Sequence, residues 1–204
     1  MAVRLSAKDR KAQIVREVFS LADEIGPDRL STTDVARAVG LTQPAIFRHF
    51  STRGDLWLAV ADDIAAQLTA AWSRAEADAQ TPEVRLKALI GAQLNAIAGT
   101  PSLPSILFSR ELQVDNPPLR DVFRLLLGGF QARLVRVIAV QQAKGKLRPA
   151  MPAEDIAILL TSLVQGVAIR WALDARSFCL VDEGLRLFDV QMALLDPQKG
   201  NHDA

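Results

Sequence analysis

Apolar residues recur at intervals of three and four positions along almost the whole 204-residue chain. This spacing puts apolar side chains on one face of an α-helix. The alternation of β-branched and aromatic residues with polar ones, which is typical of strands, is missing from the sequence. Glycine and proline fall between the periodic stretches, where they separate helices. The sequence therefore predicts an all-α protein.

The expected helices differ strongly in length. The first ends at Gly26 and Pro27. Two very short helices follow, and helices of about seven or eight residues gain their stability by packing on a scaffold. A uniform bundle would not need two such helices near the front of the chain. The expected helices cover 7–25, 33–39, 43–50, 52–77, 82–97, 105–114, 117–144, 153–175 and 182–195.

Local signals mark several helix starts. Ser6 with Asp9, and Thr52 with Asp55, have the spacing of capping boxes, in which each member satisfies a backbone amide of the other. Thr42 is expected to cap the second short helix with its hydroxyl. These polar residues are expected to determine where the helices begin.

Charge and composition exclude some classes of protein. The net charge of +1 argues against coating nucleic acid by bulk charge, although a local basic face is compatible with it. The single cysteine, Cys179, excludes an intrachain disulfide and fits a reducing compartment, and the first residues lack the pattern of an export signal. The most apolar segment, 156–169, is shorter than the roughly 20 residues of a membrane span, so we expect a buried helix there. We therefore expect a cytoplasmic protein without a membrane partner.

Residues 31–50, STTDVARAVGLTQPAIFRHF, have the anatomy of a helix-turn-helix. Gly40 permits the tight turn between the two short helices. In the second of them, Ile46 and Phe50 lie four positions apart and are expected to face inward. The other positions of that helix can then point outward, as the recognition helix of such a motif requires.

The first turn of the second short helix suits the reading of base edges. Glutamine can bond two atoms of adenine in the major groove, and a small or apolar residue can touch a thymine methyl group. Gln43, Pro44 and Ala45 occupy that turn. Nearby hydroxyl and basic side chains suit phosphates, which fix the register of a protein on DNA without reading its sequence. These are Thr32, Thr33, Arg48, His49 and Arg53.

Taken together, residues from about 10 to 60 resemble the DNA-binding domain of the TetR family of transcriptional regulators. That pattern has threonines opening the second helix, a glycine turn, an aromatic-x-His-Phe run, and a basic residue before a leucine-rich fourth helix. Here the run is FRHF at 47–50. Phe47 stands where the family commonly has tyrosine, so a phenol-to-phosphate hydrogen bond worth roughly 0.5 to 1.5 kcal/mol is lost. The resemblance implies DNA contacts at Thr32, Thr33, Gln43, Pro44, Ala45, Phe47, Arg48, His49 and Arg53.

The resemblance also implies two domains and a homodimer. A helix-turn-helix domain of three helices is expected at 1–52, and a helical effector-binding and dimerisation domain at 53–204. The last two helices are expected to form the dimer interface. Segment 156–173 is apolar on nearly every side, which suits a helix buried between its own core and a partner. In the last helix the candidates for this interface are Leu187, Val190, Met192 and Leu194 or Leu195.

A pocket for a small-molecule effector among the middle helices is a further implication of the resemblance. Its candidate lining residues are apolar and aromatic side chains on helices that can surround a cavity. Aromatic residues at helical spacing equally suit an ordinary core. Gln165 and Arg170 are polar groups in an apolar run, and they fit a pocket, the core or the dimer interface. The candidate effector-binding residues are Trp72, Phe108, Leu112, Phe130, Leu134, Gln165 and Trp171.

The sequence contains no recognisable catalytic or metal-binding constellation. It has two histidines, His49 and His202, and neither a glycine-rich phosphate loop nor HExxH spacing. We therefore expect no enzymatic activity, no cofactor and no metal. The predicted function is that of a sequence-specific transcriptional regulator, a repressor released from a palindromic operator by an effector. The alternatives are an effector-independent or chromosome-organising DNA-binding protein of the same fold and, outside this class, a helical enzyme or ligand carrier.

Overall fold

The computed structural model describes residues 6–197, and this part of the chain folds into ten helices and no strand. The prediction of an all-α protein is confirmed. The chain divides into two compact units. The first contains the described residues up to Ala66 together with Thr100–Arg124, and the second contains Gln67–Gly99 and the described residues from Leu125 onward.

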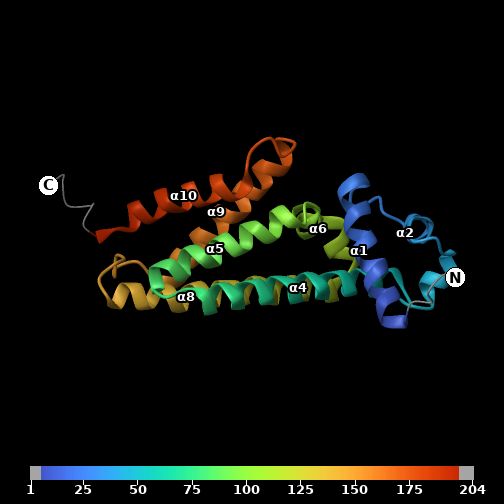
Figure 1. Cartoon of the computed structure of the whole chain (residues 1–204), viewed down its shortest axis with the longest axis horizontal. Helices are drawn as coiled ribbons and strands as arrows, with labels where there is room; N and C mark the ends of the chain where they lie inside the picture. Colours follow the sequence, from blue (N-terminus) through green and yellow to red (C-terminus); the bar gives the residue numbers. More distant parts are fainter. Residues whose placement is uncertain (1–5, 198–204) are drawn as a thin grey trace. The chain divides into compact units, whose positions relative to one another are not determined.

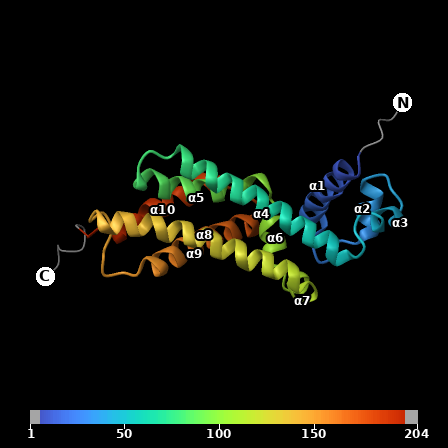
Figure 2. The same ribbon diagram turned by 90° about the horizontal axis from the view of Figure 1, so that it is seen from below.

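The first unit is built on α1 (Ala7–Ile25), against which α2 (Thr32–Ala38) packs. In turn, α3 (Gln43–Phe47) packs on α2 (Figure 2), and the beginning of α4 (Arg53–Asp78) belongs to the same unit. Packing supplies the stability that helices as short as α2 and α3 lack alone. The fully buried side chains of these four helices include Ile14, Val18, Val35, Ile46 and Trp57.

Capping explains where most of these helices begin. The Ser6 hydroxyl accepts from the Asp9 amide at 3.1 Å, and Thr52 and Asp55 exchange two hydrogen bonds of 3.0 Å, as predicted. The prediction for Thr42 was wrong, because its side chain makes no capping hydrogen bond. In the first turn of α3, Pro44 has no amide hydrogen to donate, and the next amide donates to the Thr42 carbonyl at 2.9 Å instead.

The stretch predicted as one helix over 105–114 is two helices, α6 (Leu103–Phe108) and α7 (Arg110–Asp115), so that prediction was wrong. The break lies at Ser109, whose backbone is extended and whose hydroxyl accepts from the Leu112 amide at 3.0 Å. The same hydroxyl donates to the carboxylate of Asp28, between α1 and α2. A buried serine with two such partners ends one helix and caps the next.

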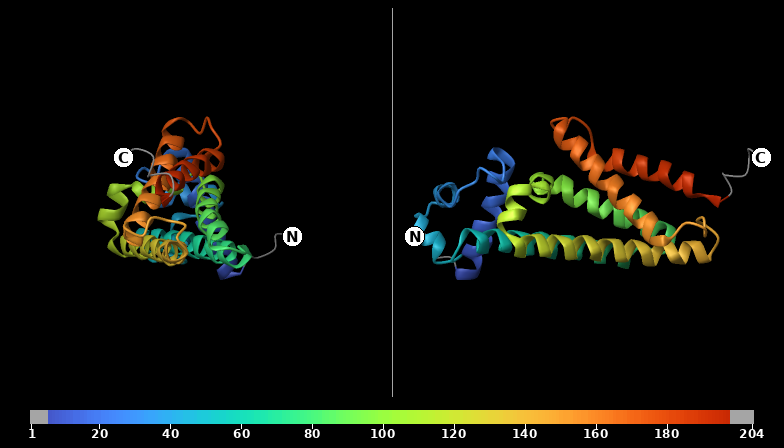
Figure 3. Two further views of the ribbon diagram at one scale, coloured as in Figure 1. Left: turned by 90° about the vertical axis from the view of Figure 1, so that its left-hand side faces the viewer. Right: turned by 180° about the vertical axis from the view of Figure 1, so that it is seen from behind.

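The second unit contains the rest of α4 with α5 (Pro82–Gly99), most of α8 (Pro117–Ala143), α9 (Ala153–Leu173) and α10 (Leu180–Leu195). In Figure 1, α10 lies against both α5 and α9, and the right-hand view of Figure 3 shows these helices from behind. The Leu94 side chain of α5 lies directly against the backbone of Gly184 in α10, where an added Cβ would stand 2.5 Å from a side-chain carbon of Leu94. Glycine at this position allows α10 to pack directly on α5.

An aromatic pair and ion pairs hold α4 against α8 in the second unit. The ring centroids of Trp72 and Phe130 are 4.9 Å apart, and the Trp72 indole nitrogen donates to Gln93 of α5 at 2.8 Å. Arg133 of α8 pairs with Glu76 of α4. A buried tryptophan whose polar atom is satisfied contributes both apolar area and a defined geometry. These contacts fix α4, α5 and α8 relative to one another.

The helix α4 runs without a break from Arg53 to Asp78, and its first turns belong to the first compact unit. The compact units therefore do not follow the expected division between residues 52 and 53. Residues of α4 beyond position 52 pack with the first unit, so the boundary between the compact units is not the boundary expected for a DNA-binding domain. The functional division at this position stays a prediction.

Helix α9 is longer than the apolar segment 156–169 that the sequence singles out. With 21 residues and a mean hydropathy of 1.8, it is long and apolar enough to cross a membrane by these two criteria. In the structure 44% of its most apolar window is buried, and the helix packs against α5 and α10. Core helices of globular proteins meet the same criteria, so length and composition here are weak evidence for a membrane span.

Candidate nucleic-acid interface

Gly40 forms the turn between α2 and α3. Its φ of +69° lies in the left-handed region, which costs glycine less than any other residue. The Leu41 amide donates to the Ala36 carbonyl at 2.8 Å, and the Gly40 amide donates to the Arg37 carbonyl at 3.2 Å. These bonds satisfy the last carbonyls of α2 and end that helix. The turn therefore has the role that the sequence predicts for Gly40.

The residues of α3 and the turn after it divide between a buried and an exposed side. Ile46 is fully buried and Phe50 nearly so, as expected. Phe47, which suits either the core or the DNA backbone by its type, is 40% exposed and so faces outward. The helix ends at Phe47, earlier than the predicted end at residue 50, and the amides of His49 and Phe50 both donate to the Ile46 carbonyl. Gln43, Pro44 and Arg48 are exposed, and Ala45 and His49 are partly exposed.

The side chains of Gln43 and Thr32 are joined by a hydrogen bond of 2.9 Å, in which the glutamine amide donates to the threonine hydroxyl. Thr32 is only 8% exposed, whereas Thr33 is exposed. The two threonines therefore differ in their surroundings, although the sequence pattern treats them alike. The hydroxyl of Thr32 orients the Gln43 side chain through this hydrogen bond. The exposed hydroxyl of Thr33 is the one that a phosphate could reach.

Arg53 stands at the first position of α4 and is exposed. One of its terminal nitrogens donates to the Leu30 carbonyl at 3.2 Å. A guanidinium has five N–H donors, so the others remain for a phosphate while this bond aims the group. The carbonyl before α2 therefore positions a basic group of α4.

A capping box that was not predicted from the sequence stabilises the same surface at the start of α2. The Ser31 hydroxyl accepts from the Asp34 amide at 3.2 Å, and the Asp34 carboxylate accepts from the Ser31 amide at 3.1 Å. Hydrogen bonds from the Ser31 side chain and backbone, with the nearby Arg37 guanidinium, hold the pKa of Asp34 below its usual value. The S-x-x-D spacing was the signal that could have revealed it. Arg37, which was not among the predicted DNA contacts, is also exposed on α2.

Comparison with known proteins bears directly on this motif. A family model described as "Bacterial regulatory proteins, tetR family" matches residues 14–60, which include α2, α3 and the turn between them. The chain is 22% identical over 158 residues to the nucleoid occlusion factor SlmA of Marinomonas sp. (strain MWYL1), covering 78% of this chain and 80% of that protein.

Solved structures share the fold of about nine tenths of the chain. A TetR-family transcriptional regulator from Agrobacterium tumefaciens has a TM-score of 0.77 at 19% identity, covering 94% of this chain and 100% of that one. The transcriptional regulator FadR from Bacillus subtilis, in complex with stearoyl-CoA, has a TM-score of 0.76 at 16% identity, covering 89% and 97%.

Residues 14–60 of the chain thus match the TetR family of regulatory proteins. This match makes the chain a DNA-binding regulator. The relatives named above are DNA-binding proteins and regulators rather than enzymes, in agreement with the expectation from the sequence. The exposed first turn of α3 lies within the matched residues. Its contacts with DNA, residue by residue, stay a prediction.

The residues predicted to bind an effector do not share one compact unit. Phe108 and Leu112 belong to the first unit, and Phe108 is 45% exposed. In the second unit, Trp72, Phe130 and Leu134 are buried, and the first two are in contact. Two more members of the set lie on α9: Gln165, which is partly exposed, and the buried Trp171, whose indole donates to the Phe178 carbonyl at 3.1 Å. These contacts suit a packed core, and an effector-binding role for the set stays a prediction.

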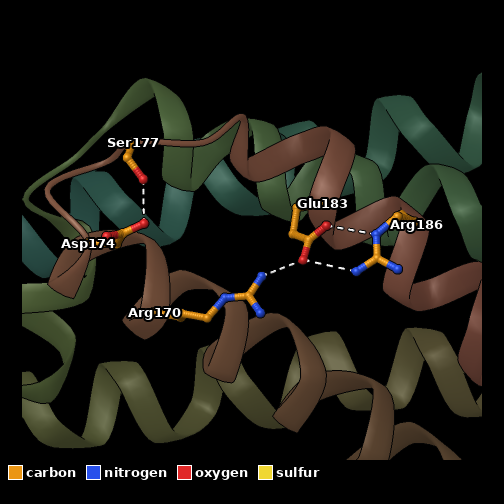
Figure 4. Close-up of polar contacts among 5 residues, drawn as sticks. All are labelled: Arg170, Asp174, Ser177, Glu183 and Arg186. Carbon is orange, nitrogen blue, oxygen red and sulfur yellow. Dashed lines mark hydrogen bonds and ion pairs between the residues drawn. The ribbon is translucent and has the colours of Figure 1, made fainter.

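Arg170, whose place the sequence left open, is part of an ion-pair cluster between α9 and α10 (Figure 4). Its guanidinium bonds to Glu183 at 2.5 Å and stands 5.0 Å from the centre of the Phe178 ring. Arg186 donates two further hydrogen bonds, of 2.8 and 3.0 Å, to the same carboxylate. Hydrogen bonds from Arg186 and Arg170 lower the pKa of Glu183 to about 2. Within the chain, therefore, Arg170 ties α9 to α10.

Proposed function

We propose that the protein is a homodimeric repressor, working in the cytoplasm, that binds a palindromic operator and is released from it by a small-molecule effector. The observation that carries the proposal is the exposed first turn of α3, held by the buried Ile46 beneath it and by the Thr32–Gln43 hydrogen bond beside it. A recognition helix reads base edges with the side chains of this turn. A rigid turn costs less ordering on binding than a mobile one.

We assign the contacts to two classes. Gln43 has one amide hydrogen and its carbonyl oxygen left after bonding to Thr32, which is the donor and acceptor pair that adenine requires. Pro44 and Ala45 offer apolar contact to a thymine methyl group. The remaining members contact phosphates and set the register without reading sequence. In this proposal they are Thr33, Phe47, Arg48, His49 and Arg53, with Thr32 acting through Gln43.

Dimerisation through α9 and α10 is supported by the apolar side chains that these helices leave exposed. A monomer rarely keeps a large contiguous apolar surface in water. Gly166 lies on the exposed side of α9 with no atom of the chain near the position of a Cβ, so a partner helix has room to approach. Of the two candidate leucines at the end of α10, Leu194 is 66% exposed and Leu195 is buried. The exposed large apolar residues of these helices are Ile158, Leu159, Ile169, Leu173, Val190 and Leu194.

Release by an effector is supported by the structural likeness to FadR from Bacillus subtilis, whose structure contains stearoyl-CoA. A ligand that prefers one arrangement of the dimer shifts the population toward it by as much as its affinities for the two differ. In this proposal the arrangement with effector bound spaces the two α3 helices so that they do not match the half-sites.

Selection of binding sites from random DNA with the purified protein provides the operator for the test. Footprinting is then expected to protect two symmetric half-sites about 34 to 36 Å apart, one turn of DNA. Arg48→Ala should weaken the protection, whereas the matched control Arg124→Ala, an exposed arginine of α8 paired with Asp121, should leave it unchanged. If no symmetric site is protected under any condition, the proposal is wrong.

Effector binding is tested by thermal unfolding with a library of small molecules. A ligand at about 100 times its dissociation constant stabilises the folded protein by about 2.7 kcal/mol. A compound that shifts the unfolding temperature should also release operator DNA. Binding of such a compound without any loss of operator affinity would contradict release by that effector.

A second candidate function is supported by the likeness to SlmA, which is named a nucleoid occlusion factor. In this alternative the protein binds many chromosomal sites without an effector and organises or marks the chromosome. Mapping its binding sites across the genome distinguishes the two. A few sites beside regulated genes support the repressor, and many dispersed sites whose occupancy no compound changes support the alternative.

A further inference from the structure

A pocket of about 460 Å³, open to solvent on one side, lies on the second unit, where the end of α4, the beginning of α5 and the C-terminal half of α8 meet. None of the residues predicted to bind an effector lines it. Its apolar wall consists of Ala77, Pro82, Val137 and Val140, and Val140 is 44% exposed. The charged residues that line it are Glu76, Arg85 and Arg136.

The guanidinium of Arg85, which lines this cavity, has N–H donors that no residue of the described chain engages. One terminal nitrogen donates to the Ala79 carbonyl at 3.2 Å. The Nε atom is buried and has no acceptor among the residues that the structure describes. Because an arginine cannot lose its proton in a protein, this N–H is always a donor, and leaving it unpaired costs free energy. A ligand oxygen cannot reach Nε itself, but the terminal nitrogens keep N–H groups that an anion beside Arg85 can accept from, and such an anion would offset the charge of the whole guanidinium.

The other charges at the cavity leave a second guanidinium available. Glu76 is engaged by Arg133 through one oxygen and stands 3.5 Å from Arg136 through the other. The Arg136 side chain is mostly exposed, and a contact of this length in water holds it weakly. Two arginines therefore line the cavity against one carboxylate that Arg133 already neutralises in part. Two guanidinium groups and one carboxylate give the lining a net charge of +1, which a monoanion neutralises.

We propose that this cavity binds a small amphipathic carboxylate. The carboxylate is held by Arg85, with Arg136 as the second cation, and the apolar body lies along Val137 and Val140. Planar carboxylates match the fork of donors on a guanidinium, and the bonds are charge-assisted on both sides. Binding at this site is independent of the proposed function, and only an effect of the ligand on DNA would rest on it.

Sodium octanoate is the probe, titrated into the full-length protein and followed by the ¹H–¹⁵N signal of Arg85 Nε and by the thermal unfolding temperature. Saturable movement of that signal and a matching rise in unfolding temperature are expected. Octan-1-ol, of the same length without the charge, should bind at least about tenfold more weakly, because a hydrogen bond to a charged group contributes this much. Equal binding of the alcohol would show that the arginines have no part in recognition and would overturn the proposal.

Variants locate the site. Arg85→Gln should weaken octanoate binding about tenfold or more, and Arg136→Gln should weaken it less, because Arg136 is the more exposed of the two. The control is Arg124→Gln, an exposed arginine of the same helix α8 that does not line the cavity. Because the Arg136 side chain is mostly exposed, Arg136→Gln should fold even if Arg85→Gln does not, so the site can still be tested. Unchanged octanoate affinity in both cavity variants would overturn the proposal.

Operator affinity measured in the same samples separates this inference from the proposed function. Octanoate binding at Arg85 without any change in operator affinity supports the site and denies it a role in release. If the protein binds the operator but shows no saturable octanoate binding, the proposed carboxylate site is wrong and the proposed DNA recognition is unaffected.

Discussion

Gln43 of α3 donates a hydrogen bond of 2.9 Å to Thr32 of α2, a residue eleven positions earlier in the chain. The bond links a candidate base-reading side chain to the first residue of the helix on which α3 packs. Because Thr32 is nearly buried, we expect its hydroxyl to influence DNA binding chiefly through Gln43. Orientation of the glutamine before DNA arrives reduces the side-chain entropy lost on binding.

Thr32→Val tests this orientation. The substitution keeps the shape and removes the hydroxyl, so operator affinity should fall by roughly 0.5 to 1.5 kcal/mol, the net contribution of one hydrogen bond. Affinity for random DNA should stay the same, because only base reading depends on Gln43. Thr33→Val is the matched control, and it should weaken operator and random DNA equally. Both affinities are measured by fluorescence anisotropy, and equal losses from Thr32→Val would refute a role through Gln43.

Gln43→Ala and Arg53→Ala should affect different quantities. Gln43→Ala should cost roughly 1 to 3 kcal/mol at the operator and relax the preference at one base pair. Arg53→Ala should weaken binding to all sequences and reduce the slope of log affinity against log salt by about 1, because one phosphate contact is lost. Titrations at several salt concentrations check both. If the two variants lose affinity equally for operator and random DNA, the assignment of roles is wrong.

Two glycines of the α5–α10 interface should respond oppositely to alanine. At Gly184 a Cβ would collide with Leu94, so Gly184→Ala should lower the free energy of unfolding by roughly 1 to 3 kcal/mol. At Gly91 the nearest atom outside its own helix is 3.9 Å from a Cβ, an ordinary contact. Gly91→Ala should therefore raise the stability by roughly 0.5 to 1 kcal/mol through helix propensity. Urea unfolding measures both, and similar losses would show that the close approach at Gly184 is not the cause.

Charged substitutions on α9 and α10 should dissociate the dimer. Leu173→Glu or Leu194→Glu places a carboxylate on the proposed interface, where burying an unpaired charge is costly. Leu125→Glu is the control, because Leu125 is equally exposed but lies on α8. Sedimentation equilibrium should give the monomer mass for the first two variants and the dimer mass for the control. If Leu125→Glu dissociates the dimer and the other two variants do not, the interface is formed by α8 rather than by α9 and α10.

The ion pairs of Glu183 should contribute to stability only above acid pH. Hydrogen bonds from Arg186 and Arg170 lower the pKa of Glu183 from 4.5 to about 2. Because the pKa is lower in the folded state, the stabilisation is fully present above about pH 4.5 and is lost as the pH falls toward about 2. The difference in stability between wild type and Glu183→Gln should shrink across that interval.

Variants of the two arginines refine that prediction. Arg186→Gln should bring the folded-state pKa of Glu183 closer to its usual value than Arg170→Gln does, because Arg186 has the larger effect on this pKa. The pH interval over which the stabilisation is lost should therefore be narrower in Arg186→Gln. Urea unfolding midpoints across the interval provide the measurement. A wild-type curve parallel to that of Glu183→Gln would contradict the depressed pKa.

Features encoded by neighbouring residues could be predicted well. The bounds of α1 agree with those expected, because Ser6 caps one end and Gly26 stops the other. The helix-turn-helix was also predictable, since Gly40 and the inward pair Ile46 and Phe50 belong to one short motif. In each case the determining interactions span only a few residues.

Predictions failed where a polar side chain had a choice of partners. Ser109 has the type of residue that fits a helix interior poorly, but its contact with Asp28, far away in sequence, determines the break between α6 and α7. Thr42 has the type of residue that caps a helix, but Pro44, two positions later, lacks an amide hydrogen, and the Ala45 amide donates to the Thr42 carbonyl instead. Residue type indicates the capacity for a hydrogen bond, and the surroundings select the partner.

The sequence by itself determined that this chain is helical and that it carries a helix-turn-helix of the TetR type, because periodicity, turns and caps act over short distances. Only the tertiary structure decided that Thr32 supports Gln43, that Arg170 pairs with Glu183, and that Arg85 lines a cavity with an unpaired donor. Each of these relationships joins residues on different helices or depends on how helices pack around a side chain. Such contacts are set by the packing of whole helices, which the pattern along a single helix does not specify.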